Sequence, residues 1–370
     1  MIKSKYLIVG DNFIGLEAVK VLLKKNKKIV YADASSNAID APDFLAYKSF
    51  THDYLTRKTT VTMTEYIDAK TKFEIEYKKR IEFLIQKQKL IHLPGQPELV
   101  KDNIAGVHTK NGQELIQFEK IIYVPSAKNF VENSIIKDLG SLSRMEDIWK
   151  DIELTKNIGI ITDRWQDVEV AYLLSKLKIK TTLVVPSAIF EIIKDKIGTE
   201  SLTILDIKDI QEVTTNVIRT AKTIQVSKIY YNYNSLVNHH YYNLNEKILK
   251  NVLVLGDSVN QNHETVIHNL EEKFVKPILE RLYEESEYTV NHIRLRDTIL
   301  TYSNVSREDE IISDYRLEDK NVKGVFKLNK KNFIITAYLE GEDSIINYFY
   351  NRIRTNLNIS EVRNFLRHNV

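Results

Sequence analysis

Apolar runs alternate with helical patterns over much of the chain, which is typical of an α/β fold. The run Tyr6–Val9 predicts a buried strand, and apolar residues at helical spacing predict a helix over 14–25. A second strand is predicted over 28–33. The same order recurs later, so two β-α-β units are expected. The second unit consists of a strand at 158–161, a helix at 168–177 and a strand at 181–185.

Between and after these units the pattern is more varied. Residues 34–60 are polar and predicted to be irregular, and a charged helix is expected over 70–89. Lys110-Asn111-Gly112-Gln113 is an Asn-Gly hairpin signal. Residues 286–370 alternate strand signals with a helix at 343–355, which predicts a separate α+β unit. Further predictions are a buried strand at 118–124, short strands over 202–231, a strand at 251–257 and a helix over 264–285.

The first strand ends in a turn with glycine at both ends, Gly10 and Gly15. In dinucleotide folds the first glycine makes a tight turn and the last lets the helix pack close to the strand. The middle position, usually glycine where backbone meets a pyrophosphate, is Asn12. Asp33 follows the second strand, where such folds place a ribose-binding carboxylate, although a turn aspartate is an equal alternative. Plain β-α packing without a nucleotide is therefore the competing interpretation of this stretch.

The second β-α turn has lost its glycines. Thr162, Arg164 and Asp167 stand at the three glycine positions. A carboxylate at the start of a helix repels a phosphate, so ordinary NAD(P) binding is not expected here. Trp165 could fill the vacant nucleotide site or simply pack, and Glu169 is either a satisfied helix carboxylate or a group near a cofactor.

Composition narrows the functional classes. The 370 residues suggest two or three domains, and a net charge of +3 argues against a nucleic-acid partner. The chain contains no cysteine, which removes disulfides and thiolate chemistry, and no stretch is long enough for a signal peptide or membrane span. A soluble cytoplasmic protein is expected. No metal site is expected either; the histidines considered for one are His239, His240, His263 and His268.

The order of these motifs resembles the pyridine nucleotide-disulfide oxidoreductases, which include dihydrolipoamide dehydrogenase and mercuric reductase. The resemblance covers the whole chain. Its motifs are the turn 10–15 with Asp33, the strand-end segment 118–128 (FEKIIYVPSAK), the degenerate NAD turn 162–171 (TDRWQDVEVA), and Leu255-Gly256-Asp257. Segments 324–327, 334–343 and 357–362 resemble the family's dimerisation domain. At the family's catalytic histidine this sequence has Asn369, and the partner glutamate is absent.

The resemblance implies two Rossmann-like three-layer dinucleotide-binding domains and a C-terminal α+β dimerisation domain. The expected boundaries are 1–145 with 247–285 for the FAD-type domain, 146–246 for the degenerate NAD-type domain, and 286–370 for the dimerisation domain of a homodimer. The FAD-binding residues it implies are Gly10, Asn12, Phe13, Ile14, Gly15, Asp33, Ser126, Gly256 and Asp257.

Two functional hypotheses follow. The first is a divergent FAD-binding oxidoreductase-like flavoprotein that lacks disulfide-reductase chemistry and binds no NAD(P)H in the usual way. The second is a pseudoenzyme of the same fold, acting as a dimeric binding or assembly subunit. The sequence identifies no catalytic residue, substrate or electron acceptor for either one.

Overall fold

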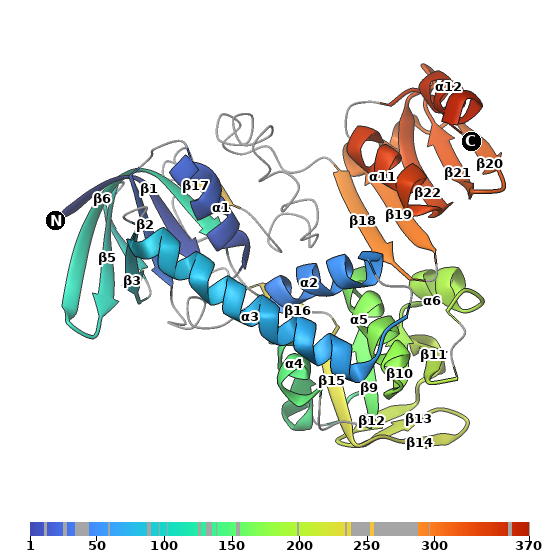
Figure 1. Ribbon diagram of the computed structural model, residues 1–370, viewed down its shortest axis with the longest axis horizontal. Helices are drawn as coiled ribbons and strands as arrows, with labels where there is room; N and C mark the ends of the chain where they lie inside the picture. Colours follow the sequence, from blue (N-terminus) through green and yellow to red (C-terminus); the bar gives the residue numbers. More distant parts are fainter. Residues whose placement is uncertain are drawn as a thin grey trace.

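The protein folds into three α/β units, each built on its own sheet (Figure 1). The computed structural model describes residues 1–10, 13–24, 28–33, 44–57, 60–86, 90–95, 97–101, 103–124, 127–130, 135–137, 139–152, 156–197, 200–233, 235–237, 252–254, 288–295, 297–353 and 357–369. The mixed α/β fold class predicted from the sequence is confirmed.

The first unit is a sheet with a parallel centre. β1 (Ile2–Gly10) lies between β2 (Ile29–Asp33) and β6 (Gly112–Val124), and β17 (Val252–Val254) pairs with the end of β6. The helix α1 (Phe13–Lys24) covers one face, because its apolar stripe packs on the alternate residues of β1. The other strands are β3 (Ile91–Pro94), β4 (Pro97–Lys101) and β5 (Ile104–Thr109).

The predicted Asn-Gly hairpin joins β5 to β6. Thr109 pairs with Gly112, which has φ +116°, a backbone conformation that suits glycine. Residues of β5 and β6 then pack with the opposite face of β1 and β2. Since β5 and β6 are strands of this same sheet, the sheet curves over that face, and among the described helices α1 and α3 (Met63–Gln86) cover the other face.

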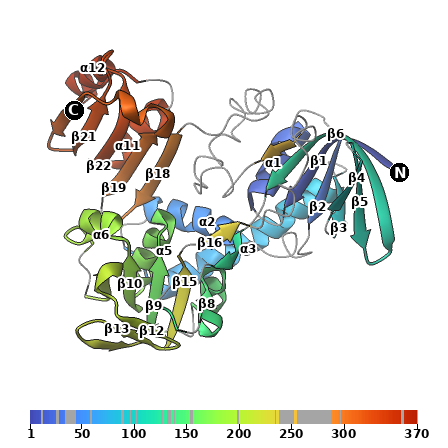
Figure 2. The same cartoon turned by 180° about the vertical axis from the view of Figure 1, so that it is seen from behind.

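The second unit is a fully parallel sheet in the order β11-β10-β9-β15-β8. Its predicted strand-helix-strand core is confirmed as β9 (Asn157–Thr162), α5 (Trp165–Lys176) and β10 (Lys180–Val185). A small antiparallel sheet covers the face opposite α5, as Figure 2 shows. The remaining strands are β8 (Ser143–Arg144), β11 (Leu202–Asp206), β12 (Glu212–Thr214), β13 (Val217–Arg219), β14 (Thr223–Gln225) and β15 (Lys228–Asn232).

Two long helices connect these units. The stretch 34–60 was expected to be irregular, but the structure forms α2 (Phe44–Arg57) there. The prediction was wrong because the buried face of α2 includes Lys48 and Thr51, which interrupt its apolar spacing. Helix α3 (Met63–Gln86) begins before its predicted start and runs between the units, with Tyr66 in the core of the second and Tyr77 in that of the first.

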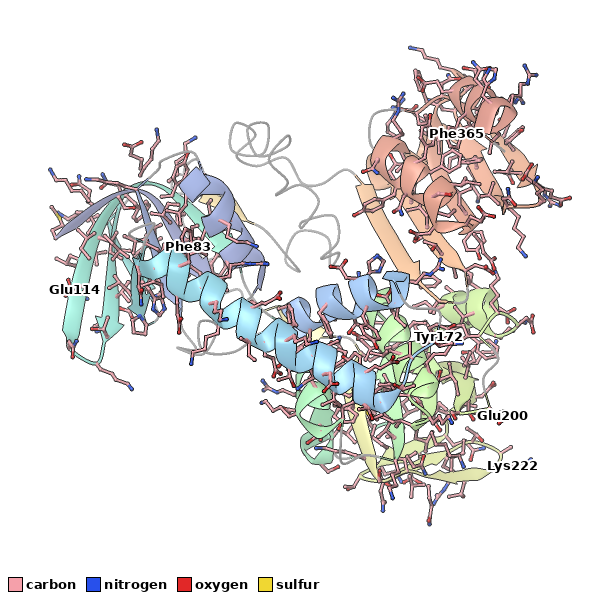
Figure 3. All side chains as sticks on the ribbon, viewed as in Figure 1. Phe83, Glu114, Tyr172, Glu200, Lys222 and Phe365 are labelled. Carbon is pink, nitrogen blue, oxygen red and sulfur yellow. The ribbon has the colours of Figure 1, made fainter. Side chains whose placement is uncertain are left out.

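The third unit is a five-stranded antiparallel sheet in the order β18-β19-β22-β21-β20. α11 (Asp343–Arg352) and α12 (Ile359–Asn369) pack on one face through Phe349 and Val362. Figure 3 labels Phe365 on this helical side. The strands are β18 (Tyr288–Arg294), β19 (Thr298–Asn304), β20 (Ser313–Glu318), β21 (Val322–Leu328) and β22 (Ile334–Gly341).

Shorter elements complete the described chain. An antiparallel ribbon pairs β7 (Ala127–Phe130) with β16 (Ser235–Val237). The short helices are α4 (Ile148–Asp151) and α6 (Ser187–Ile193), with 3-10 turns at Leu139–Ser141, Met145–Asp147, Ile207–Asp209 and Val305–Glu310. Among the described helices, none combines the length and hydropathy needed to cross a bilayer. The predicted helix over 264–285 lies outside the described residues.

Candidate functional site

The carboxyl ends of four parallel strands of the first sheet meet at one edge. Gly10 at the end of β1 is in register with Val124 at the end of β6, and Asp33 ends the neighbouring strand β2. β17 ends nearby at Val254, which pairs with Tyr123 of β6. Ligands of open α/β sheets bind outside this edge, so the predicted nucleotide site is expected here.

Part of the predicted site lies beyond the described residues. Gly10, Gly15 and the backbone of Phe13, Ile14 and Asp33 are described. The strands that lead into the remaining positions do end at the same edge, because β6 precedes Ser126 and β17 precedes Gly256. The assignment of these residues to FAD stays a prediction. The predicted positions outside the described residues are Asn12, Ser126, Gly256 and Asp257.

Both turn glycines are required by close packing of the protein on itself. A Cβ at Gly10 would lie 2.6 Å from the carbonyl oxygen of Val124, and a Cβ at Gly15 would lie 3.2 Å from the Tyr31 ring. Gly10 thus permits the close approach of β1 to β6, and Gly15 permits α1 to approach β2. The close helix packing at Gly15 is the use expected from the sequence, whereas the tight turn expected after Gly10 involves residues 11 and 12, which lie outside the described residues. Both contacts hold with or without a nucleotide.

The first turn of α1, residues 13–16, holds no acidic side chain. The amino end of a helix carries free N–H groups and a partial positive charge, which attract a phosphate. In the sequence this end comes three residues after Gly10, the last residue of β1, and Asp33 is the last residue of the neighbouring strand β2. The end of β1 together with the start of α1, here called the first cradle, thus presents the backbone groups and the dipole that a pyrophosphate needs.

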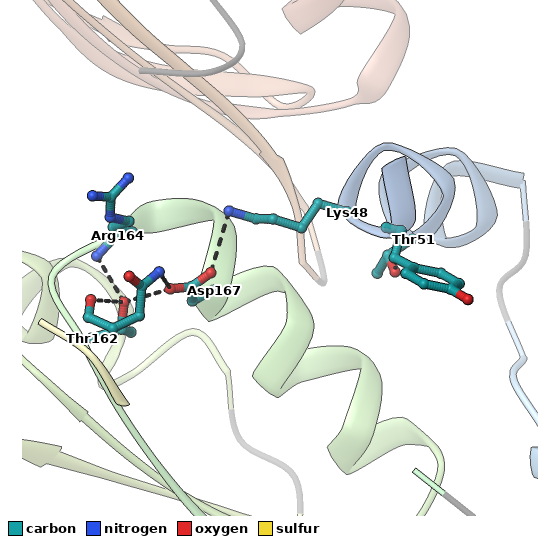
Figure 4. A network of polar contacts seen from close by, with 7 residues as sticks. Lys48, Thr51, Thr162, Arg164 and Asp167 are labelled. Carbon is teal, nitrogen blue, oxygen red and sulfur yellow. Dashed lines mark hydrogen bonds and ion pairs between the residues drawn. The ribbon is translucent and has the colours of Figure 1, made fainter. Parts of the chain in front are cut away.

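The second cradle, formed by the end of β9 and the start of α5, holds an acidic side chain where the first cradle has none (Figure 4). Asp167 occupies in α5 the position that Gly15 has in α1, and its side chain is fully buried. Its Oδ2 accepts hydrogen bonds from the Thr162 hydroxyl at 2.7 Å and from the Asn232 side-chain amide at 2.6 Å. These donors come from the carboxyl ends of β9 and β15, so the edge of this sheet binds a carboxylate of the protein itself.

Lys48 completes this arrangement from outside the unit. Its Nζ lies 3.2 Å from Asp167 Oδ1, and its side chain is 8% exposed. It projects from α2, which Figure 4 shows beside the amino end of α5. Sequence reasoning missed this residue because it placed the surrounding stretch in irregular chain; the signal was a lysine among Leu45, Tyr47 and Phe50.

Other residues around the start of α5 also make contacts within the protein. Arg164 precedes the helix, is buried, and donates its backbone N–H to the Thr162 hydroxyl at 3.0 Å. Trp165 is partly exposed and packs against the core of the second unit, in agreement with the packing interpretation. The side chains of Thr162, Trp165 and Asp167 therefore serve the structure of the protein.

Glu169 lies two residues after Asp167 on α5 and is almost completely buried. Its Oε1 lies 2.8 Å from His52 Nδ1 of α2 and accepts the backbone N–H of Arg294 of β18 at 2.7 Å. These contacts agree with the interpretation of Glu169 as a helix carboxylate whose hydrogen bonds are made within the protein. Glu169 thereby joins the second unit to α2 and to the first strand of the third unit.

The described part of the chain contains no group of three histidine, aspartate or glutamate side chains that could hold a metal ion. The histidines considered from the sequence, His239, His240, His263 and His268, lie outside the described residues.

Comparison with known proteins identifies the class of fold. No protein-family model matches the sequence, and no curated protein matches it. Solved structures match over the full length, and the fold is that of a flavoprotein disulfide reductase. One such structure is the HOCl-induced flavoprotein disulfide reductase RclA from Escherichia coli. It has a TM-score of 0.68 and 16% identity, and the match covers 99% of this chain and 96% of that chain.

The Cu(II) complex of RclA gives a TM-score of 0.70 at 15% identity, covering 100% of this chain and 96% of that chain. The Cu(II) complex of a cysteine-to-serine mutant of the same protein gives 0.68 at 16% identity, with the same coverage. At this identity the likeness concerns the fold. The chain described here differs from a disulfide reductase in one decisive respect, because its sequence has no cysteine.

Proposed function

We propose that this chain is an FAD-binding flavoprotein in which only the first of the two nucleotide cradles takes a dinucleotide. The observation that carries the proposal is the contrast between equivalent helix starts. Gly15 and an acid-free first turn stand at α1, whereas a buried Asp167 bound by Lys48 stands at α5. The flavoprotein structures that share the fold support binding of a flavin.

The described residues of the first cradle fit this cofactor. Free N–H groups at the start of α1 would bind the pyrophosphate, and Asp33 at the end of β2 would accept hydrogen bonds from ribose hydroxyls. When bound, FAD would supply an acceptor for one or two electrons. The chain's own contribution is to hold the cofactor at the carboxyl edge of the first sheet and to orient it there.

Two steps of disulfide-reductase chemistry are excluded from the proposal. A redox disulfide cannot form within a sequence that has no cysteine. NAD(P)H is not proposed as the reductant, because its phosphates would meet the buried Asp167 and the side chains that bind it. The copper of the RclA complexes also has no part in the proposal, since the described residues offer no metal cluster.

A direct test is the absorbance spectrum of the purified full chain, followed by titration with FAD and then with NADH. The proposal expects a flavin spectrum, or FAD uptake, and no bleaching of the flavin by NADH. A well-folded protein that neither carries nor takes up FAD would contradict it. That result, with a partner protein recovered by the chain, would instead support the pseudoenzyme hypothesis.

We also propose that the chain forms a homodimer through its third unit. The resemblance of segments 324–327 and 334–343 to a dimerisation domain supports this, as does their position in a compact sheet covered by helices on one face. Light scattering after size-exclusion chromatography measures the mass directly. A monomer at micromolar concentration would contradict the proposal.

A further inference from the structure

Helices α2 and α5 and strand β18 meet at one junction, as Figure 1 and Figure 2 both show. Each of these three elements contributes buried apolar side chains to one hydrophobic cluster there: Tyr54 and Leu55 from α2, Val170 from α5, and Ile293 and Leu295 at the end of β18. Charges that lie against such a cluster interact more strongly than charges in water.

One carboxylate oxygen joins the three elements at this junction. Glu169 Oε1 of α5 lies 2.8 Å from Nδ1 of His52 on α2 and accepts the backbone N–H of Arg294 on β18 at 2.7 Å. The Glu169 side chain is 5% exposed, whereas the His52 side chain is 23% exposed. The imidazole can therefore exchange a proton with water while it faces a carboxylate that is shielded from water.

The neighbouring charges favour a proton on His52. Lys48 lies one helical turn before His52 on α2, and its Nζ is 3.2 Å from Asp167 Oδ1 of α5. Since Lys48 and Asp167 balance each other, a neutral His52 would leave the Glu169 carboxylate without a counter-charge in this group of four side chains. A protonated His52 supplies that charge, and an opposite charge in contact favours the protonated form.

The other charged groups around α2 are engaged elsewhere. The Arg294 guanidinium donates to a hydroxyl of β19 at 2.5 Å. Glu74 of α3 accepts the Tyr47 hydroxyl at 2.5 Å, on a different face of α2, because Tyr47 and His52 are five positions apart. Asp53, which follows His52, is exposed to solvent. The contact of His52 with Glu169 thus dominates the environment of the Nδ1 side of the ring.

We propose that His52 and Glu169 form a pH-sensitive switch at the junction of α2, α5 and β18. With a proton on His52 the two side chains form a shielded ion pair, which holds α2 on α5 and keeps the carboxylate in place for Arg294. Without that proton the contact is a weaker hydrogen bond from a neutral ring. An imidazole ordinarily titrates near pH 6.5, so the change falls in the physiological range.

The direction of the pH effect follows from the charges. The folded state binds the His52 proton more tightly than the unfolded chain does, because Glu169 is in contact only in the folded state. The stability that the pair contributes is therefore fully present in mild acid and is lost as the pH rises through the titration of folded His52. α2 also supplies Ala46 to the core of the first unit, so the switch bears on how firmly that unit is joined to the other two.

The test uses the full chain without added cofactor, so it does not depend on FAD binding. His52→Gln keeps a polar side chain that does not titrate. Urea unfolding from about pH 5.5 to about pH 8.5 spans the ordinary imidazole titration. We expect the wild type to exceed His52→Gln in unfolding free energy most at the acid end, with the difference shrinking as the pH rises.

Hydrogen exchange locates the effect at the junction. The protection factor of the Arg294 amide, which is corrected for the intrinsic pH dependence of exchange, should be about fivefold higher in the wild type than in His52→Gln in mild acid, because hydrogen bonds to charged groups are the stronger ones. Near the alkaline end the two proteins should agree. Glu169→Gln keeps an acceptor without the charge, so its stability should no longer depend on the proton of His52.

His108 provides a matched control. Its Nε2 lies 3.7 Å from Glu98 Oε2, and the two side chains are 59% and 72% exposed. An exposed pair is hydrated and screened, so His108→Gln should leave the pH profile of stability and the Arg294 protection unchanged. Thermal unfolding of each variant checks that the fold is kept.

A titration of the wild type alone keeps the proposal testable if a variant fails to fold. The ring signals of carbon-13-labelled histidine are followed by nuclear magnetic resonance, and the His52 signal is the one that the spectrum of His52→Gln lacks. We expect its midpoint above the ordinary value of about 6.5. A midpoint at or below that value, or a stability difference between wild type and His52→Gln that is the same at every pH, would overturn the proposal.

Discussion

Lys48 Nζ lies 3.2 Å from Asp167 Oδ1, and the two side chains are 8% and 0% exposed. The pair links a helix outside the second unit to the helix start where a dinucleotide fold would bind a pyrophosphate. A buried carboxylate needs a counter-charge and hydrogen-bond donors, and this one has both from the protein. The ion pair in the second cradle therefore connects α2 to α5.

The first prediction concerns this pair. Asp167→Asn removes the carboxylate that faces the buried Lys48 ammonium. Lys48→Met removes the ammonium that faces the buried Asp167 carboxylate. Either change should cost about 3–5 kcal/mol of unfolding free energy, the range for breaking a buried ion pair from one side. The double variant should cost clearly less than the sum, because no unpaired charge remains. Urea unfolding of the four proteins measures the difference.

An exposed pair provides the control. Lys194 and Glu191 are in contact on the surface of the second unit, with side chains 37% and 56% exposed. Glu191→Gln should change the unfolding midpoint little, since such pairs are hydrated and screened. Strict additivity of the two buried substitutions would contradict the ion-pair explanation.

Glu169 supports a second prediction, about the connection to the third unit. Its Oε1 accepts the Arg294 backbone N–H, and the same oxygen contacts His52. Glu169→Gln weakens a hydrogen bond to a charged group, with an expected loss of about 1.5–3 kcal/mol. Hydrogen exchange should show faster exchange of the Arg294 amide in this variant. Unchanged protection of that amide would mean that pairing of β18 with β19 alone protects it.

Several parts of the fold could be predicted because local sequence determines them. The apolar strands at Tyr6–Val9 and 158–161 and the hairpin glycine Gly112 have patterns that depend on near neighbours. The helix α2 could not be predicted in this way. Its buried face contains Lys48, whose partner Asp167 lies far along the sequence, so tertiary contact determines which face is inside.

The same distinction applies to the sites. The loss of glycine at Asp167 was visible in the sequence and predicts a helix start that disfavours a phosphate. The side chains that bind Asp167 could not be deduced, because Lys48 and Asn232 come from elements distant in sequence. The pairing of Tyr47 with Glu74 was hidden for the same reason, since its two residues lie on different helices.

A third prediction separates the two glycines of the first turn. Gly10→Ala would place a Cβ 2.6 Å from the backbone oxygen of Val124, which cannot move without shifting β6. Gly15→Ala would meet the Tyr31 ring at 3.2 Å, where a small rotation relieves the contact. Gly10→Ala should therefore lower the melting temperature more, with a cost of about 1–3 kcal/mol typical of overpacking. The order should be the same with and without added FAD, and equal melting temperatures would contradict it.

The fourth prediction concerns Asp206, at the carboxyl end of β11. Its Oδ1 accepts hydrogen bonds of 3.0 Å from the Ser187 hydroxyl and from the Lys208 backbone N–H, and its side chain is fully buried. Burial alone would raise the pKa of Asp206, but the bonds from Lys208 and Ser187 outweigh it, so the pKa lies below its usual value.

The pH dependence follows from this direction. A carboxyl whose pKa is lowered by folding contributes its full stability above its unfolded pKa, about 3.9, and loses it as the pH falls through the lower folded pKa. Asp206→Asn should therefore destabilise the protein most near neutral pH, and the gap to the wild type should narrow in acid. Ser187→Ala removes one donor, so it should move the acid loss to higher pH. Urea unfolding at several pH values tests both, and a gap that stays constant down to the acid limit of folding would show that ionised Asp206 does not stabilise the fold.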